Sequence, residues 1–181
     1  MGADRWVSSD QVTGLQLSLE TASSKGFQGD MASDSNGFMI SPNMAYQVSP
    51  EWSLYGSLGL GQSNIDSRIL LLNDSYEMHR YSATLNSQGQ YPLGSAFVRP
   101  KFTLSFMRNN ADAYNLGGSI LGTPINLRMP KNSYNFGTLE SSVEINRLYR
   151  LDNGSALMPY TELGIAYDFE RSDSGRYLDG I

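Results

Sequence analysis

The chain has 181 residues without a single cysteine, and 40% of its residues are hydrophobic but only 17% are charged. Because typical soluble domains carry about 25% charged residues, the mean hydropathy of −0.35 reflects abundant uncharged polar residues. The net charge of −5 argues against a basic surface that binds nucleic acid, and the missing thiols exclude disulfides and cysteine chemistry. The single histidine, His79, excludes metal sites built from several histidines.

Apolar and polar residues alternate with period two along most of the chain, whereas helical spacing and long apolar runs are rare. This pattern predicts strands with one apolar and one polar face. The strand expected near residues 98–106 is the clearest example, with Phe102 and Leu104 on one face and Lys101 and Thr103 on the other. We predict seven antiparallel strands, at residues 12–22, 38–48, 52–62, 78–90, 98–106, 136–151 and 157–169.

The connections between these strands alternate between long and short. Outer-membrane β-barrels have short turns on one rim and long loops on the other, so we predict an all-β antiparallel meander that forms such a barrel or part of one. One connection, residues 109–134, is long for a loop and leaves room for a further strand near residues 125–127. The long connections are residues 23–37, 63–77 and 109–134, and the short ones are residues 49–51, 90–95 and 152–155.

Charged residues fall on the polar faces of the predicted strands, where they would line the lumen of a barrel. A cation at mid-membrane on the lipid-facing side costs about 2–4 kcal/mol, and a register shift of one residue would move the whole set into lipid. Arg147 does fall on the apolar face, but close to a short connection, where the cost is about 0–1 kcal/mol. The predicted lumen-facing residues are Arg80, Arg99, Lys101, Glu140, Glu144 and Glu162.

Aromatic residues gather near the ends of the predicted strands. Two aromatic girdles are expected where a barrel crosses the two membrane interfaces, although aromatic residues also favour strands in general. We interpret these residues as interfacial. They are Tyr46, Trp52, Tyr91 and Tyr149 near the short connections, and Phe38, Tyr167 and Phe169 near the long ones.

Several segments carry a more specific pattern. Residues 2–6 with 12–15 form a hairpin start in which a Gly-x-Asp strand end precedes a Gly-Leu strand, and residues 37–61 contain the next hairpin. Residues 99–106 place a proline before alternating apolar residues, and residues 158–169 contain Pro-Tyr-Thr-Glu-Leu. Together these segments resemble the β-domain of bacterial autotransporters, the translocator of type V secretion. Members of that family carry prolines at positions like Pro42, Pro100 and Pro159, which cannot donate a hydrogen bond within a sheet.

The resemblance implies an outer-membrane barrel of a Gram-negative bacterium whose partners are lipid and a secreted passenger polypeptide. It implies no catalytic residue, cofactor or metal. The family domain is larger and usually ends on an aromatic residue, whereas this chain ends at Asp179, Gly180 and Ile181. The helical linker that threads the pore is also missing, so the self-cleavage of some members is not carried over.

These departures, with the odd number of predicted strands, indicate one barrel domain over residues 1–181 that is incomplete at both ends. An unclosed sheet leaves unpaired backbone groups along both edges. We therefore expect the edges to be hidden, either by strand pairing between copies or by an apolar face that curls inward.

Candidates for catalysis are few. His79 and Ser82 lie three residues apart on a predicted strand and therefore on opposite faces, which prevents a serine–histidine pair. Glu144 and Glu162 could face each other like the carboxylates of a glycosidase, but ion pairs with lumen cations explain them better. Two alternatives remain open: a soluble β-sandwich or partial barrel that binds a ligand or carbohydrate through its long loops, and a small outer-membrane enzyme.

Overall fold

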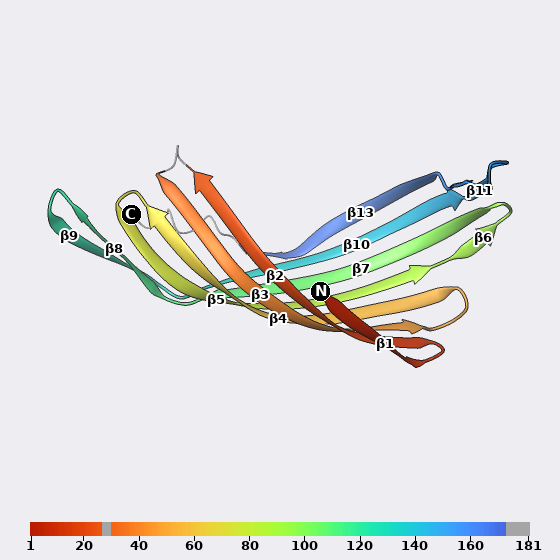
Figure 1. Cartoon of the computed structure of the whole chain (residues 1–181), viewed down its shortest axis with the longest axis horizontal. Helices are drawn as coiled ribbons and strands as arrows, with labels where there is room; N and C mark the ends of the chain where they lie inside the picture. Colours follow the sequence, from red (N-terminus) through yellow and green to blue (C-terminus); the bar gives the residue numbers. More distant parts are fainter. Residues whose placement is uncertain (27–29, 173–181) are drawn as a thin grey trace.

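The computed structural model describes residues 1–26 and 30–172, and this part of the chain consists of antiparallel strands and turns (Figure 1). No helix within it is long and apolar enough to cross a membrane. The end of the sequence, Asp179 to Ile181, lies outside the described residues. The strands are β1 (Gly2–Ser8), β2 (Gln11–Gly26), β3 (Met31–Gln47), β4 (Trp52–Ile69), β5 (Leu72–Gly89), β6 (Tyr91–Leu93), β7 (Ala96–Ala111), β8 (Tyr114–Ile120), β9 (Thr123–Met129), β10 (Asn132–Arg147), β11 (Tyr149–Arg150), β12 (Ala156–Leu157) and β13 (Tyr160–Arg171).

One curved sheet holds eleven of these strands. Its main path is β1-β2-β3-β4-β5-β7-β10-β13, while β6, β8 and β9 extend it and β11 pairs with β12 separately. Strands β1 and β13 are the two edges of this path, and within the described residues they do not pair with each other. The prediction of an all-β antiparallel meander is confirmed. A sandwich, the predicted alternative, would need a second large sheet packed on the first, which this part of the chain does not form.

The seven predicted strands correspond to β2, β3, β4, β5, β7, β10 and β13. The alternation pattern missed β1, which pairs with β2 from Gly2 opposite Gln16 to Ser8 opposite Gln11, although the family resemblance places a strand end at residues 2–6. The odd strand count was therefore wrong for the main path, which has eight strands. Strand β1 was missed because it is short and lacks a clear alternation of apolar and polar residues.

The three long connections are not the loops that were predicted. Strands β4 and β5 stay paired up to Ile69 opposite Leu72, with only Leu70 and Leu71 between them. Segment 109–134 contains the hairpin β8–β9, so the further strand considered near residues 125–127 is present as part of β9. Figure 1 shows these long hairpins at one end of the sheet and the short turns at the other. The loop prediction failed because these segments are rich in Ser, Asn, Asp and Gly, which are typical of turns. In the structure, hydrogen bonds between neighbouring strands satisfy the backbone groups of these residues.

Each proline within a predicted strand has a local explanation. Pro42 lies in β3 where the ladder to β4 is interrupted between Ile40 and Asn43, because proline has no N–H to donate. Pro100 lies in β7 directly beyond the last pair with β5, Gln88 opposite Lys101. Pro159 immediately precedes β13. The prolines thus mark interruptions or ends of ladders, as expected from their missing donor.

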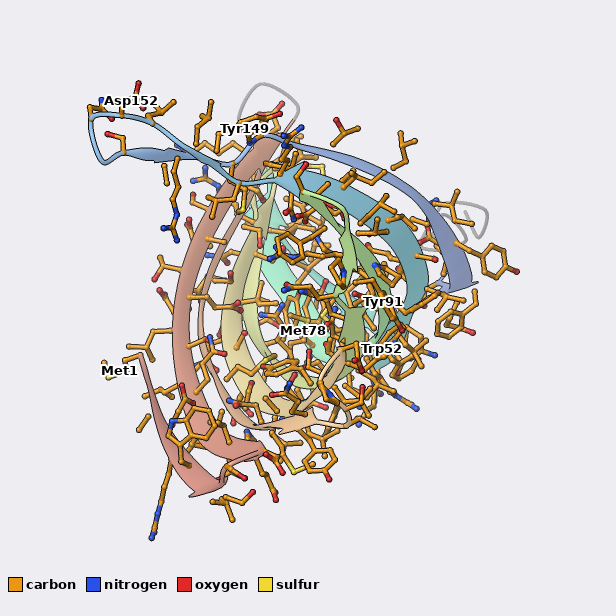
Figure 2. All side chains as sticks on the ribbon, turned by 90° about the vertical axis from the view of Figure 1, so that its right-hand side faces the viewer. Met1, Trp52, Met78, Tyr91, Tyr149 and Asp152 are labelled. Carbon is orange, nitrogen blue, oxygen red and sulfur yellow. The ribbon has the colours of Figure 1, made fainter. Side chains whose placement is uncertain are left out.

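The polarity of the sheet is the reverse of that of a soluble protein. We call the two sides the outer face, which carries Leu58 and Leu163, and the inner face, which carries Glu144 and Asn146. The two outer leucines are 62% and 77% exposed, whereas Glu144 and Asn146 are 8% and 2% exposed. Figure 2 looks along the sheet from the end with the short turns and shows it curving around a space filled with side chains. The expectation that the apolar face curls inward is therefore wrong; pairing of edges between copies stays a prediction.

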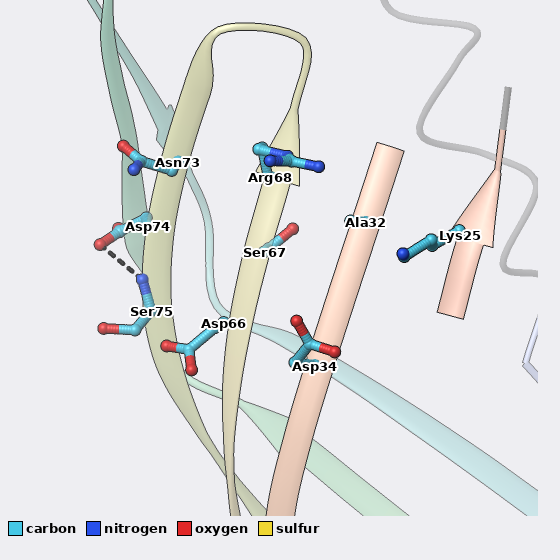
Figure 3. A pocket seen from close by; sticks show the side chains of 9 residues that line it. All are labelled: Lys25, Ala32, Asp34, Asp66, Ser67, Arg68, Asn73, Asp74 and Ser75. Carbon is cyan, nitrogen blue, oxygen red and sulfur yellow. Dashed lines mark hydrogen bonds between the residues drawn. The ribbon is translucent and has the colours of Figure 1, made fainter. Parts of the chain in front are cut away.

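Toward the long hairpins, the apolar side chains of β4 and β5 change from the outer face to the inner face. On β4 the outer face is apolar from Trp52 to Leu60, but further along the strand Ile65 points to the inner face and is 7% exposed. Beyond the switch the outer face is polar, with Asp34 directly opposite Asp66. An open hollow of about 680 Å³ lies there, lined by Lys25, Ala32, Asp34, Asp66, Ser67, Arg68, Asn73, Asp74 and Ser75 (Figure 3). The outer face thus has an apolar belt bounded by a polar rim.

Beyond the switch, the inner face carries a small apolar core. Leu116 of β8 is 1% exposed, and the ring of Tyr114 stacks on that of Tyr76 of β5 with 4.3 Å between centroids. Burial, and secondarily the neighbouring Tyr114, raises the pKa of Tyr76 above its ordinary value. Hairpin β8–β9 therefore docks on β5 in the way that a soluble protein packs, with apolar groups inside.

Candidate functional site

The six predicted charged residues all lie on the inner face of the sheet. Antiparallel partners share a face, and the ladders place Arg99 opposite Glu144 and Glu144 opposite Glu162. Lys101 is two residues from Arg99 on β7, and Glu140 is four residues from Glu144 on β10, so each lies on the same face as its neighbour. Arg80 of β5 lies opposite Asn109 of β7, which is also on that face. One register therefore brings residues from four strands, β5, β7, β10 and β13, to a common surface.

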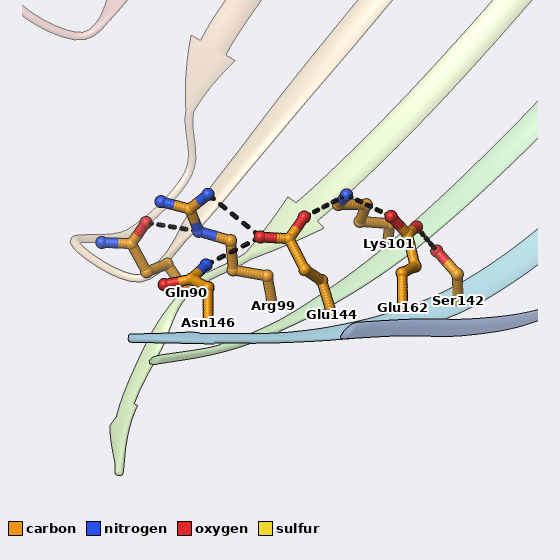
Figure 4. Close-up of polar contacts among 7 residues, drawn as sticks. All are labelled: Gln90, Arg99, Lys101, Ser142, Glu144, Asn146 and Glu162. Carbon is orange, nitrogen blue, oxygen red and sulfur yellow. Dashed lines mark hydrogen bonds and ion pairs between the residues drawn. The ribbon is translucent and has the colours of Figure 1, made fainter. Parts of the chain in front are cut away.

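Four of the six form one ion-pair network. The Nζ of Lys101 lies 2.6 Å from Oε2 of Glu144 and 3.1 Å from Oε2 of Glu162, and Arg99 donates to Glu144 at 3.4 Å (Figure 4). Asn146 donates a further hydrogen bond to Glu144 at 2.7 Å, and Ser142 donates one to Glu162 at 2.6 Å. The nearly buried carboxylate of Glu144 is thus satisfied from three sides, as a desolvated charge requires. Glu140 lies outside this network, opposite Thr103.

A second ion pair joins Arg80 of β5 to Glu20 of β2 across two intervening strands. Ser63 of β4 also donates to Glu20, at 3.0 Å. Gly37 of β3 lies between them, and a Cβ there would approach the Oγ of Ser63 to 2.2 Å. The absence of a side chain at Gly37 therefore allows Glu20 to reach its partners. The sequence prediction missed Glu20 because its cation lies on a distant segment, although its position on the polar face of the strand was a usable signal.

The predicted aromatic residues fall into two groups at the two ends of the apolar belt. Near the short turns, the indole N–H of Trp52 donates to the hydroxyl of Tyr91 (Figure 2). The Trp52 ring also stacks on Phe102, with 6.4 Å between centroids. Tyr149 belongs to the separate hairpin β11–β12, where the guanidinium of Arg147 lies 4.7 Å from its ring centre. Tyr46 lies on β3, opposite Leu54 of β4.

At the other end of the belt, Phe38 lies on β3 and is 44% exposed, and Tyr167 lies on β13 opposite Leu139 of β10. Phe169 lies at a bulge where the β10–β13 pairing shifts between Gly137 and Thr138. Its ring covers Gly137, where a Cβ would approach it to 2.4 Å. Phe169 thus lies near the end of β13, whereas Phe38 lies in the middle of β3, because that strand begins at Met31 and not at the predicted start. Contact of these residues with a membrane interface stays a prediction.

Sequence comparison with known families decides what this sheet is. The family model described as the autotransporter β-domain matches residues 1–179. The chain belongs to the autotransporter β-domain family. A solved structure similar to this β-domain is the crystal structure of the β-domain of the Bordetella autotransporter BrkA, with a TM-score of 0.68 and 18% sequence identity. The match covers 93% of this chain and 68% of that chain, and at this identity it supports the fold alone. No curated protein sequence matches.

Membership of the autotransporter β-domain family supports an outer-membrane translocator role. Within the residues that the structure describes, neither hydrolase arrangement considered from the sequence is formed. The ladder places His79 and Ser82 on opposite faces, and the ammonium of Lys101 lies between the carboxylates of Glu144 and Glu162. A carboxylate pair bridged by a cation lacks the free acid and base that glycoside hydrolysis needs. What this surface offers chemically is a fixed pattern of charges and hydrogen-bonding groups.

Proposed function

We propose that this β-domain forms the wall of an outer-membrane translocator in a Gram-negative bacterium and gives a secreted passenger a polar path past the lipid. The observation that carries the proposal is the reversed polarity of the sheet. Its exposed apolar belt suits contact with lipid, whereas its inner face carries the ion-pair network of Arg99, Lys101, Glu144 and Glu162. In water, an exposed apolar surface of this extent would be unfavourable.

The width of the apolar belt also supports the proposal that the sheet spans a membrane. From Trp52 to Leu60 the outer side chains of β4 are apolar or small over nine residues, and from Phe38 to Tyr46 those of β3 follow the same rule. A tilted transmembrane strand needs about 9–11 residues to cross the hydrocarbon core. We propose that Tyr46, Trp52, Tyr91 and Tyr149 mark one interface, and Phe38, Tyr167 and Phe169 the other.

We propose further that the role is not enzymatic. The inner charges are matched by opposite charges and by amide or hydroxyl donors, which suits a wall that stays chemically inert. The purified β-domain should hydrolyse ester and glycoside substrates no faster than its His79→Ala and Glu144→Gln variants; a loss of turnover in either variant would contradict this part.

The chain contains no cysteine, so single cysteines can test the two faces of one strand. Ser105 and Leu104 are neighbours on β7 and point to the inner and outer faces. In the full-length gene product, produced in Gram-negative cells with a stalled passenger that carries one cysteine, Ser105→Cys should cross-link to the passenger and react with a water-soluble maleimide. Leu104→Cys should react only with a membrane-partitioning reagent. Cross-linking of Leu104→Cys to the passenger would contradict the proposal. A lack of cross-linking in both variants would contradict it as well.

A further inference from the structure

A cluster of metal-ligating side chains lies at the polar rim of the outer face, outside the surface described above. Glu77 and His79 are both on β5, and Asp112 follows β7 directly. The pairs Met78–Ala111 and His79–Asn110 fix the register here, and the backbone N–H of Asp112 donates to the carbonyl of Glu77 at 3.0 Å. One ligand atom from each of the three side chains lies within 4.8 Å of the other two.

The charges of this cluster are not balanced within it. Glu77 and Asp112 lie directly across from each other, and like charges in that position are destabilising. Lys131 is 3.4 Å from Oδ1 of Asp112, but its side chain is 65% exposed and its single charge cannot neutralise both carboxylates. The other carboxylate oxygen of Asp112, Oδ2, faces Nε2 of His79 at 3.8 Å. Two carboxylates and one imidazole nitrogen thus converge. With the positive charge of Lys131 counted, one negative charge remains in excess when the imidazole is neutral.

We propose that Glu77, His79 and Asp112 bind a divalent transition-metal ion, with Zn²⁺ as the best match. Zinc takes imidazole nitrogen and carboxylate oxygen at about 2.0–2.2 Å, and three protein ligands leave one position for water. A mixture of nitrogen and oxygen ligands favours Zn²⁺ over Mg²⁺ or Ca²⁺, which prefer oxygen alone. The ligand atoms must move closer together to reach these distances, and the partly exposed side chains are free to rotate.

The position of the site gives the metal a structural consequence. Asp112 lies between β7 and β8, and Lys131 lies between β9 and β10, so the two residues mark the two ends of the β8–β9 hairpin. A metal bound by Glu77, His79 and Asp112 links β5 to the first of these ends. His79 is two residues beyond Tyr81 on the same face of β5, in the polar rim, where ions from water have access. Zinc is therefore expected to hold the base of this hairpin.

The test uses the histidine itself as the probe, because the chain contains only one. The β-domain is purified in detergent without a histidine tag and titrated with ZnCl₂, while the imidazole signals are followed by NMR and the heat by calorimetry. The expected result is one zinc per chain, a shift of the His79 signals and a rise in the thermal unfolding temperature. The variants His79→Ala and Asp112→Asn should weaken binding by at least about tenfold, because even the loss of a group that only supports a ligand costs about 10- to 100-fold in metal affinity.

Two further variants separate a metal site from a network of salt bridges. Lys131→Gln removes the cation that competes for Asp112 and should tighten zinc binding several-fold, whereas Asp152→Asn, in the turn between β11 and β12, should leave it unchanged. Heat-modifiable mobility on gels checks that each variant is folded. Unchanged His79 signals up to millimolar ZnCl₂, or full binding by Asp112→Asn, would overturn the proposal. CaCl₂ binding that survives His79→Ala would overturn it as well.

Discussion

At the scale of single residues, Lys101 holds the inner network together. Its ammonium contacts both Glu144 and Glu162, at 2.6 and 3.1 Å, and its side chain is only 25% exposed. Glu144 itself is nearly buried. Removing one partner from such a pair leaves a desolvated charge, which costs more than the pair contributes when intact.

We therefore expect Lys101→Leu to destabilise the β-domain by about 1–3 kcal/mol, the range for an unsatisfied buried polar group. Leu104→Val, on the same strand but on the exposed outer face, should cost less than about 1 kcal/mol, as small apolar trims do. Urea titrations of folding into lipid vesicles, read by tryptophan fluorescence, give both values. Equal losses would mean that the inner charges act independently and that the network contributes nothing.

At the scale of elements, hairpin β8–β9 docks on β5 through a close backbone contact. Leu72 lies opposite Gly118 and Asn73 opposite Gly117. A Cβ at Gly118 would approach the carbonyl oxygen of Leu71 to 2.3 Å, whereas a Cβ at Gly117 would meet no atom within 4 Å. Only one of these two adjacent glycines is therefore required by the packing.

This pair makes a matched test of the docking. Gly118→Ala should cost about 1–3 kcal/mol by overpacking and should separate the rings of Tyr76 and Tyr114. Gly117→Ala should be neutral or slightly stabilising, because it restricts the unfolded chain. Limited proteolysis within residues 113–131 and hydrogen exchange of β8 measure the change. Equal proteolysis of the two variants would show that the hairpin is not held by this contact.

At the scale of the whole molecule, the solvent on each side of the sheet explains its polarity. The outer face is apolar only over the belt, and beyond Leu60 and Tyr81 apolar residues move to the inner face at Ile65 and Tyr76. A lipid layer with water beyond it accounts for both halves of this pattern: lipid favours apolar groups outside, and water favours them inside.

Two arginine substitutions on one face of β4 locate the edge of that layer. Leu58→Arg lies within the belt and should cost about 2–4 kcal/mol when the β-domain folds into vesicles, whereas Asn64→Arg lies beyond it and should cost about 0–1 kcal/mol. The same urea titrations in lipid provide the values. If both substitutions cost the same, the belt does not coincide with the hydrocarbon core.

The faces of the strands could be read from the sequence because side chains alternate with a period of two. This period put Arg99, Lys101, Glu144 and Glu162 on one face, as the ladder has them. The switch of polarity was also present, since apolar residues move from even positions up to Leu60 to odd positions at Ile65 and Ile69 on β4. The sequence pattern did not reveal it, because the many polar residues of that segment are typical of a loop.

The sequence by itself determined the fold class, the strand faces and the family, because these depend on local periodicity and on residue patterns along the chain. Only the tertiary structure decided which strands pair and which distant side chains meet. The contact of Glu20 with Arg80, the docking of Gly118 on Leu71 and the convergence of His79 with Asp112 all join segments that are far apart in the sequence. Such contacts follow from register and curvature, which are set by the whole sheet and not by any single strand.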